Sequence, residues 1–409
     1  MTERFDVAVI GAGPIGAVAA RCAAECGART VLLERRGVGT TSSACTGLVS
    51  PRTLPLLGLS DRSVLRPIRS VEAFGPSGRR VALRANETKA LVLDRTRLEQ
   101  DLLDLARQAG VDVRFGCDVD RVCGQGITYQ ACESSGRKND LKASVTLIAS
   151  GPGSSIAQRS GLPSPASVFP SAQLTVEAVP FEEDTVSVFL GSSVAPGFFA
   201  WAVPAEEGLL RVGLATADGS SPQAALHRLR AERFPGVPIV KRSGGPIAIG
   251  PVADPVRDGL LLVGDAAGHV KPLSGGGLYI GGLCARIAGR VAAEAAASCR
   301  TEASDLIEYS HRCDRAVGRE LRFGLAARRL FNSLSDGQLD EALAALDQPD
   351  LLTFLAGVGD IDRLRPLPKL LLKERKLWRR LLPFLRFLEA FVSDQETESS
   401  VAPALADFL

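Results

Sequence analysis

Short apolar runs and helically spaced apolar positions alternate along the first part of the chain. The run from Asp6 to Ile10 is followed by a glycine-rich turn and then by an alanine-rich stretch, Ala17 to Cys26, with the composition of a helix. Gly27 ends this stretch, and a second apolar run covers residues 29–33. The pattern predicts a strand, a turn, a helix and a second strand within about 30 residues, which is typical of a parallel sheet covered by helices.

Further elements of the same kind follow at wider spacing. Residues 94–109 place apolar side chains on one helical face, and residues 280–297 form a long stretch of small residues that also predicts a helix. Short apolar runs that predict buried strands lie at 111–115, 145–149 and 260–263.

A different pattern occupies residues 161–250. Proline and glycine residues there separate alternating apolar runs at 185–190, 198–203 and 209–214, which predicts an antiparallel sheet in a layer of its own. Beyond residue 300 the pattern is mostly helical. The expected fold class is α/β, with a Rossmann-like domain, an inserted antiparallel-sheet domain and a helical C-terminal region.

Composition and charge narrow the class of protein. The chain has 409 residues, too long for one ordinary core, and its net charge of +2 argues against nucleic acid as a partner. Its start lacks the pattern of a signal peptide, and no run reaches the roughly 20 clean apolar residues that span a bilayer. Nine scattered cysteines without a C-x-x-C pair, and three histidines, indicate reduced thiols in a cytoplasmic protein and predict no metal site.

The glycine-rich turn after the first strand has the spacing G-x-G-x-x-G, formed by Gly11, Gly13 and Gly16. The first glycine permits a tight turn, the second lets backbone approach a pyrophosphate, and the third allows close packing of helix on strand. The N-terminus of the helix offers N–H groups and partial positive charge to phosphates. Glu34, at the end of the second strand, is placed to accept hydrogen bonds from a ribose diol. The alternative is a glycine-rich turn that opens an ordinary strand–helix–strand unit.

A second motif, Gly259-Leu-Leu-Leu-Val-Gly-Asp-Ala-Ala-Gly268, separates FAD from NAD. It resembles the strand and loop of FAD enzymes of the p-hydroxybenzoate hydroxylase superfamily, in which the aspartate contacts the ribityl chain of the flavin. The resemblance implies an FAD-binding domain of that type, with Asp265 in this role. Asp265 is also suited to cap a helix, and both roles can hold at once.

The next stretch, His269-Val-Lys-Pro-Leu-Ser-Gly-Gly-Gly-Leu278, resembles the loop of geranylgeranyl reductases and archaeal digeranylgeranylglycerophospholipid reductases. Three consecutive glycines let backbone N–H groups approach a flat ligand that a side chain would keep away. In the family this loop lies against the pyrimidine side of the flavin, which implies that Gly277 and Leu278 contact the cofactor. The resemblance covers residues 5–340.

The same resemblance implies further site residues. Arg95 matches an arginine that precedes a helix and contacts the cofactor, and Val119 lies where the family touches adenosine through its backbone. Phe199 and Trp201 match an aromatic strand, and their spacing of two puts them on one face of it. There they would bind substrate as the wall of an apolar tunnel. For Arg95 the alternative is a solvated arginine at the start of a helix. For Phe199 and Trp201 the alternative is that they are part of an ordinary sheet core.

Cys45 lies in Ala44-Cys-Thr-Gly-Leu-Val-Ser-Pro51, which resembles the segment that places a cysteine over the flavin. The resemblance implies a catalytic thiol that contacts the cofactor and helps to protonate the reduced alkene. This chain has C-x-G where C-x-x-G is commoner, and an inert buried thiol is the alternative. Two more departures are Ser150, where an aspartate is usual, and Ala205, where a lysine often follows proline. The absence of an aspartate at Ser150 argues mildly against direct use of NADPH and against a hydroxylase.

The resemblance implies an FAD-dependent oxidoreductase that saturates C=C bonds in geranylgeranyl or polyprenyl chains of a lipid, with hydride from reduced flavin. Its partners would be a prenyl lipid and an electron donor, for which reduced ferredoxin, NADPH and a quinol stay open. The alternatives are an aromatic or alkene monooxygenase of the same superfamily, and a non-redox flavin-dependent isoprenoid cyclase. The implied domains are FAD-binding at 1–65, 90–160 and 250–300, substrate at 66–89 and 161–249, and helical at 301–409.

The segment Arg363 to Phe387 is rich in leucine and holds nine Lys or Arg against one acid, Glu374. Trp378 and nearby leucines can share one helical face, which suits an interfacial helix on an anionic membrane. The alternative is an amphipathic helix that packs on its own domain with a solvated basic face. The expected location is therefore cytoplasmic, either free or peripheral on the inner face of the membrane.

Overall fold

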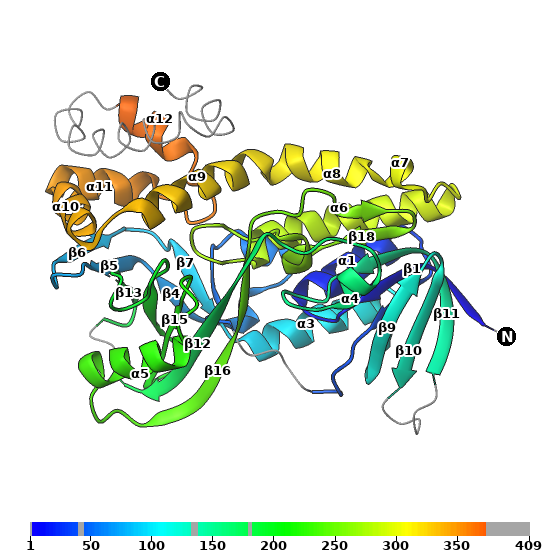
Figure 1. Ribbon diagram of the computed structural model, residues 1–409, viewed down its shortest axis with the longest axis horizontal. Coiled ribbons are helices and arrows are strands. Elements are labelled where there is room, and N and C mark those ends of the chain that lie inside the picture. The colour runs from blue at the N-terminus through cyan, green and yellow to red at the C-terminus, as the bar shows by residue number, and fades with distance from the viewer. Residues whose placement is uncertain (1, 40–44, 132–137, 179–181, 374–409) are drawn as a thin grey trace.

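Three β-sheets organise the chain, which is described by a computed structural model over residues 2–39, 45–131, 138–178 and 182–373. The two larger sheets lie on opposite sides of the view in Figure 1, and long helices run across the top. The arrangement confirms the α/β class expected from the sequence.

The first sheet has eight strands: β1 (Glu3–Ile10), β2 (Thr30–Leu33), β8 (Asp112–Arg114), β9 (Cys117–Cys123), β10 (Gly126–Ala131), β11 (Lys138–Ile148), β17 (Val256–Arg257) and β18 (Leu260–Leu262). Its centre is parallel, in the order β18-β11-β1-β2-β8. The hairpin of β9 and β10 joins antiparallel to β11, and β17 joins antiparallel to β18. The carboxyl ends of the parallel strands meet at one edge, where open α/β sheets bind their ligands.

Helices α1 (Pro14–Glu25), α3 (Arg95–Gln108) and α6 (Leu278–Ala297) cover one face of this sheet. Successive side chains of β1 point to opposite faces of the sheet. Val9 packs against these helices, whereas Ala8 packs with residues of β9 and β10. Helices α1 and α6 approach closely at Gly289, where an added Cβ would lie 2.3 Å from the carbonyl oxygen of Ala19. The small residues of both helices make this approach possible.

The second sheet has seven strands: β5 (Ser70–Phe74), β6 (Arg80–Arg84), β12 (Ser167–Glu177), β13 (Thr185–Phe189), β14 (Ala200–Pro204), β15 (Leu209–Ala215) and β16 (Ile239–Ile249). Their order is β16-β12-β15-β14-β13-β5-β6. The sheet is antiparallel as expected, apart from the parallel pair of β13 and β5, which the pattern did not predict. A long connection separates these two strands in the chain, and parallel pairing requires such a connection. Helix α5 (Pro222–Arg233) packs on β12 and β15.

A small sheet of β3 (Leu48–Val49), β7 (Ala90–Leu93) and β4 (Val64–Ile68) adjoins the second sheet. Val92 of β7 packs with Val186 of β13 and Val203 of β14 in one core cluster. Helix α2 (Thr53–Leu57) and the short 3₁₀ helix η1 (Asp61–Ser63) connect β3 to β4. This packing fixes the segment that precedes β3, which carries Cys45, next to the second sheet.

A short helix, α4 (Ile156–Arg159), packs on β9. Beyond residue 300 the described chain is helical: α7 (Ala303–Leu306), α8 (Glu308–Cys313), the π-helical turn η3 (Asp314–Gly318), α9 (Arg319–Ser333), α10 (Asp336–Leu346), α11 (Pro349–Val358) and α12 (Pro366–Lys373). In Figure 1, α8 runs beside α6, and α10 and α11 lie near β6. Across the described ranges, none of the helices is both long and apolar enough to span a membrane. Most of the predicted basic segment, from Glu374 on, lies outside the described residues.

Candidate active site

The glycine-rich turn lies between β1 and α1 at the carboxyl end of the parallel strands. Gly11 has φ +102°, and a Cβ there would lie 2.6 Å from the carbonyl oxygen of Ala149. A Cβ on Gly16 would lie 1.8 Å from the carbonyl oxygen of Gly11. Gly13 precedes the first turn of α1, and no atom of the described residues lies within 4 Å of the Cβ it would carry. Open space therefore adjoins the free N–H groups of the helix, which suits a phosphate.

Glu34 follows β2 and is buried beside this turn. Its carboxylate accepts hydrogen bonds from the backbone N–H of Ala12 at 2.8 Å and from the backbone N–H and Nε of Arg36 at 2.9 Å. Burial alone would raise the pKa of Glu34, but these hydrogen bonds outweigh burial and lower it. The carboxylate is thus held ionised near the turn, where its remaining lone pairs can accept further hydrogen bonds.

Val119 lies on β9, which begins beside Glu34, since the backbone N–H of Cys117 donates to the carbonyl of Glu34 at 2.8 Å. The side chain of Val119 is buried in the core on the face opposite α1. A contact with a ligand would therefore run through its backbone, and that contact stays a prediction.

Arg95 begins α3, whose first turn is capped by the side chain of Asp94. Burial alone would lower the pKa of Arg95, but its electrostatic interactions with Cys45, Glu99 and Asp265 and its hydrogen bond to Glu99 outweigh burial and raise the pKa. Arg95 Nη2 bonds Glu99 Oε1 at 3.0 Å, while its Nε is buried and has no hydrogen-bond partner among the described residues. Cys45 and Asp265, which were predicted from two other motifs, are therefore close enough to Arg95 to act on its guanidinium electrostatically.

Asp265 lies in the 3₁₀ turn η2 (Gly264–Ala267), directly after β18. Burial raises the pKa of Asp265 to about 6, although the charge of Arg95 opposes the rise. The glycine loop runs against it, because a Cβ on Gly277 would lie 2.6 Å from Asp265 Oδ1. Leu278 then begins α6 and is buried. The predicted residues Asp265, Gly277 and Leu278 are therefore neighbours in space.

The segment of Cys45 is held from two sides. The backbone N–H of Gly47 donates to Cys45 Sγ at 3.4 Å, and Arg211 Nη1 of β15 donates to the carbonyl of Thr46 at 2.7 Å. Thr46 Oγ1 donates to Gln173 Oε1 of β12 at 2.9 Å. Cys45 itself is exposed to solvent, so the alternative of an inert buried thiol does not hold in this structure.

Phe199 and Trp201 lie together as predicted, with ring centroids 6.0 Å apart in an edge-to-face arrangement. Trp201 Nε1 donates to Gln173 Oε1 at 3.3 Å, the same oxygen that Thr46 bonds. Phe198 stacks on Phe199 at 4.9 Å and approaches the position of a Cβ on Gly275 within 3.8 Å. The aromatic segment therefore adjoins both the Cys45 segment and the glycine loop.

Arg328 of α9 is a further residue of this region that sequence patterns did not indicate. It is buried, and it lies over the rings of Phe169 at 4.8 Å and Phe198 at 4.6 Å. Its guanidinium donates to the carbonyls of Gly197 at 3.0 Å and Pro272 at 3.4 Å, and burial lowers its pKa to about 10. Arg328 thus ties the glycine loop to the aromatic segment. A single arginine in a long helix carries no local signal that would have revealed this.

A second contact ties the glycine loop to the C-terminal helices. Lys271 Nζ bonds Asp362 Oδ1 at 2.9 Å and the carbonyl of Ile361 at 3.1 Å, and both Lys271 and Asp362 side chains are largely buried. The connection between α11 and α12 is therefore fixed to the loop that follows Asp265.

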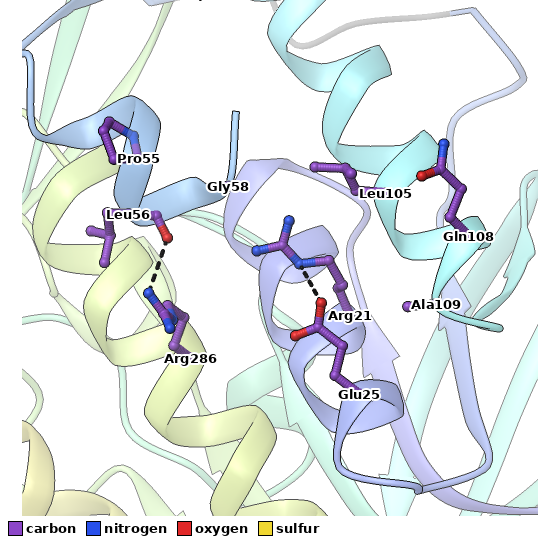
Figure 2. Close-up of a pocket in the computed structure, with 9 residues that line it drawn as sticks. All are labelled: Arg21, Glu25, Pro55, Leu56, Gly58, Leu105, Gln108, Ala109 and Arg286. Carbon is purple, nitrogen blue, oxygen red and sulfur yellow. Dashed lines mark hydrogen bonds and ion pairs between the residues drawn. The ribbon is translucent and has the colours of Figure 1, made fainter. Parts of the chain in front are cut away.

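Figure 2 shows a cavity of about 550 Å³ elsewhere, between α1, α2, α3 and α6. Arg286 Nη1 donates to the carbonyl of Leu56 at 3.3 Å, and Arg21 pairs with Glu25 at 3.4 Å across its wall. It lies at the C-terminal half of α1, away from the glycine turn, and no residue predicted for the site lines it. The cavity therefore has no part in the site described above.

Comparison with known proteins agrees with this geometry. A family model described as an FAD binding domain matches residues 4–281. Digeranylgeranylglycerophospholipid reductase 2 of Methanopyrus kandleri is 34% identical over 376 residues, covering 86% of this chain and 93% of the relative. The protein of the same name from Methanothermobacter thermautotrophicus is 32% identical over 360 residues, covering 85% of this chain and 93% of the relative.

Solved structures share the fold. A geranylgeranyl bacteriochlorophyll reductase-like protein from Thermoplasma acidophilum superposes with a TM-score of 0.81 at 22% identity, covering 95% of this chain and 100% of that one. A p-nitrophenol 4-monooxygenase from Pseudomonas putida superposes with a TM-score of 0.67 at 19% identity, covering 87% and 97%. Reductase-like and monooxygenase proteins thus use one architecture, and the fold alone does not separate them.

Proposed function

Because the chain belongs to the family of digeranylgeranylglycerophospholipid reductases and carries their FAD-binding domain, we propose that it saturates isolated C=C bonds in the prenyl chains of a lipid. The family match confirms the predicted flavin cofactor and the oxidoreductase class. The observation that supports the proposal for this chain is that Gln173 joins the Cys45 segment to Trp201, while Cys45 and Asp265 both act electrostatically on Arg95.

The residues of the site fit FAD. The open space at Gly13, next to the N-terminus of α1, would take the pyrophosphate, and the ionised Glu34 would accept hydrogen bonds from a ribose. Asp265 would accept hydrogen bonds from the ribityl chain. The buried Nε of Arg95, which lacks a partner among the described residues, would gain one from the cofactor.

When bound and reduced, FAD supplies a hydride to one carbon of the double bond, so the other carbon must gain a proton. We assign that proton to the Cys45 thiol, which is exposed at the edge of the site. Gly47 N–H and the Arg95 guanidinium are placed to stabilise the thiolate left behind, and water then returns its proton. Phe199 and Trp201 would exclude water and stabilise positive charge that develops at the alkene.

The substrate and partners follow from the same proposal. The prenyl chain would lie along Phe199 and Trp201. Many relatives have a lysine where this chain has Ala205, and if that lysine binds a phosphate headgroup, this chain would take a lipid with a different headgroup. A reductase of prenyl lipids needs an electron donor, for which reduced ferredoxin, NADPH and a quinol are the candidates. The basic segment from Arg363 would hold the protein on an anionic membrane, where its substrate resides.

A product analysis tests the reaction class. The purified holoenzyme is reduced with dithionite without oxygen, geranylgeranylated lipid is added, and the lipid mass is measured. The proposal predicts a gain of two hydrogen atoms for each bond reduced. A product that gains an oxygen atom, and forms only after air is admitted, would assign the chain to the monooxygenases that share its fold. A parallel incubation of the lipid with holoenzyme that has not been reduced tests the other alternative, because turnover without any change in flavin oxidation state would favour an isoprenoid cyclase.

A further inference from the structure

His269, Cys284 and Cys313 come together in the core beside the glycine loop, outside the flavin site. His269 follows η2, Cys284 lies in α6, and Cys313 ends α8. Their exposed fractions are 6%, 0% and 5%, and one ligand atom from each lies within 4.8 Å of the other two. We propose that these three residues bind one Zn²⁺ ion.

A second observation supports a ligand at this point. The Nδ1 atom of His269 is buried and has no hydrogen-bond partner in the described part of the chain. Buried polar nitrogens in native proteins almost always have a partner, because an unpaired one loses its hydration without compensation. The neighbouring Tyr309 does not supply a partner, since its hydroxyl donates to the carbonyl of Leu262 at 2.7 Å and its ring meets His269 edge-on at 6.2 Å. A metal ion gives the imidazole the partner that it lacks.

The donor set selects the metal. Two cysteine sulfurs and one imidazole nitrogen are ligands that zinc prefers in proteins, whereas calcium and magnesium require oxygen. Zn²⁺ with two thiolates and a neutral imidazole has no net charge, which suits a fully buried position. With Zn–S of about 2.3 Å and Zn–N of about 2.0 Å, tetrahedral ligand atoms lie roughly 3.4–3.8 Å apart. Because the ligand atoms lie within 4.8 Å of one another, the cluster needs to close by about 1.4 Å at most.

Binding of Zn²⁺ releases protons and involves no electron transfer. Each cysteine thiol gives up its proton to solvent as its sulfur bonds the ion, and the imidazole binds through a neutral ring nitrogen. The fourth position would be taken by an oxygen ligand such as water. Nothing is oxidised or reduced in this step.

The ion would act on the fold rather than on the substrate. His269 directly follows the turn that carries Asp265, while Cys284 and Cys313 belong to two helices packed against each other. Zinc would therefore fix the start of the glycine loop to α6 and α8. This role does not depend on which lipid the enzyme reduces.

Metal content of the whole purified holoenzyme tests the proposal. The protein is prepared without chelators, passed through a desalting column, and analysed for zinc by mass spectrometry. About one zinc per chain is expected in the wild type, with loss in the Cys284→Ala and Cys313→Ala variants. Cys22→Ala, which removes a buried thiol outside the cluster, is the matched control and should keep the ion.

A measurement on the wild type keeps the test decisive if a variant fails to fold. Protein produced with Co²⁺ in place of Zn²⁺ should show thiolate-to-cobalt charge-transfer absorption. Zinc-free wild-type protein that takes up neither Zn²⁺ nor Co²⁺ would overturn the proposal. So would a disulfide between Cys284 and Cys313, detected as two thiols missing from the titration of the denatured, metal-stripped chain.

Discussion

At the scale of single residues, the proposed proton transfer depends on the position of the Cys45 thiol. Its sulfur accepts a hydrogen bond from Gly47 N–H, and its neighbour Thr46 is bonded to both Gln173 and Arg211. Gln173 also bonds Trp201, so one amide oxygen aligns the thiol segment with the aromatic wall. Although this segment departs from the commoner C-x-x-G spacing, Cys45 lies close enough to Arg95 to act on its guanidinium electrostatically.

Replacement of the thiol tests its role. Cys45→Ser should leave FAD bound and slow alkene reduction by about 10²-fold or more, because a hydroxyl is a much weaker acid than a thiol. The rate of flavin reoxidation by lipid, measured without oxygen, gives the effect. Cys26→Ser, at an exposed cysteine remote from the site residues, is the control. A variant with wild-type turnover would remove Cys45 from the mechanism.

Asp265 predicts a pH dependence of cofactor binding. Its pKa is about 6 without ligand, and hydrogen bonds from the ribityl hydroxyls would favour the carboxylate. Below that pH, binding must displace a proton, so the Kd for FAD should rise by up to about tenfold for each pH unit and stay level above it. Flavin fluorescence titrations from pH 5 to pH 8 measure this. Asp265→Asn should bind FAD more weakly at pH 8 and lose the rise, and an identical pH profile in this variant would refute the assignment.

At the scale of elements, the strand, turn and helix that open the chain are fixed by local sequence. Gly11 needs its positive φ, and Gly16 lies against the carbonyl of Gly11. Apolar runs and glycine spacing reveal such a unit because every one of its constraints lies within a few residues along the chain. The same holds for the turn of Asp265 and for the glycine loop after it.

Two glycine variants should separate folding from binding in this unit. Gly13→Ala adds a methyl group into open space, so the free energy of unfolding should change by less than about 1 kcal/mol while FAD affinity falls. Gly16→Ala places a methyl group 1.8 Å from a backbone oxygen and should destabilise the fold by several kcal/mol. Chemical denaturation and flavin titration measure the two effects. Equal effects of both variants on stability would contradict the open space at Gly13, and unchanged FAD affinity of Gly13→Ala would contradict the view that Gly13 adjoins the cofactor.

At the scale of the whole molecule, sequence predicted the parts better than their assembly. The parallel strands of the first sheet, and the positions of Glu34 and Asp265 after two of them, were accessible to local pattern and resemblance, whereas the hairpin of β9 and β10 was not predicted. The parallel pairing of β13 with β5 was not, because it depends on a connection that passes through other elements. Arg328 and the cluster of His269, Cys284 and Cys313 were also missed, since their partners are distant in sequence and only packing brings them together.

The basic C-terminal segment leads to a prediction about the whole enzyme. A chain ending at Lys373 lacks Glu374 and the rest of the segment, which holds Trp378 and most of its arginines. It should keep FAD but lose binding to vesicles that contain anionic lipid, and binding of the full chain should weaken with salt. Co-sedimentation measures both. Undiminished binding of the shortened chain would place the membrane contact elsewhere, or show that the segment packs on its own domain.

The central claim, that this chain passes electrons from its flavin to a prenyl double bond, is tested most directly by one anaerobic single turnover. The holoenzyme is reduced with one equivalent of dithionite, mixed rapidly with geranylgeranylated lipid, and followed through the flavin absorption spectrum. The account predicts that lipid alone restores the oxidised flavin spectrum, with one double bond lost per flavin. A flavin that stays reduced with lipid and reoxidises only when oxygen enters would contradict the account.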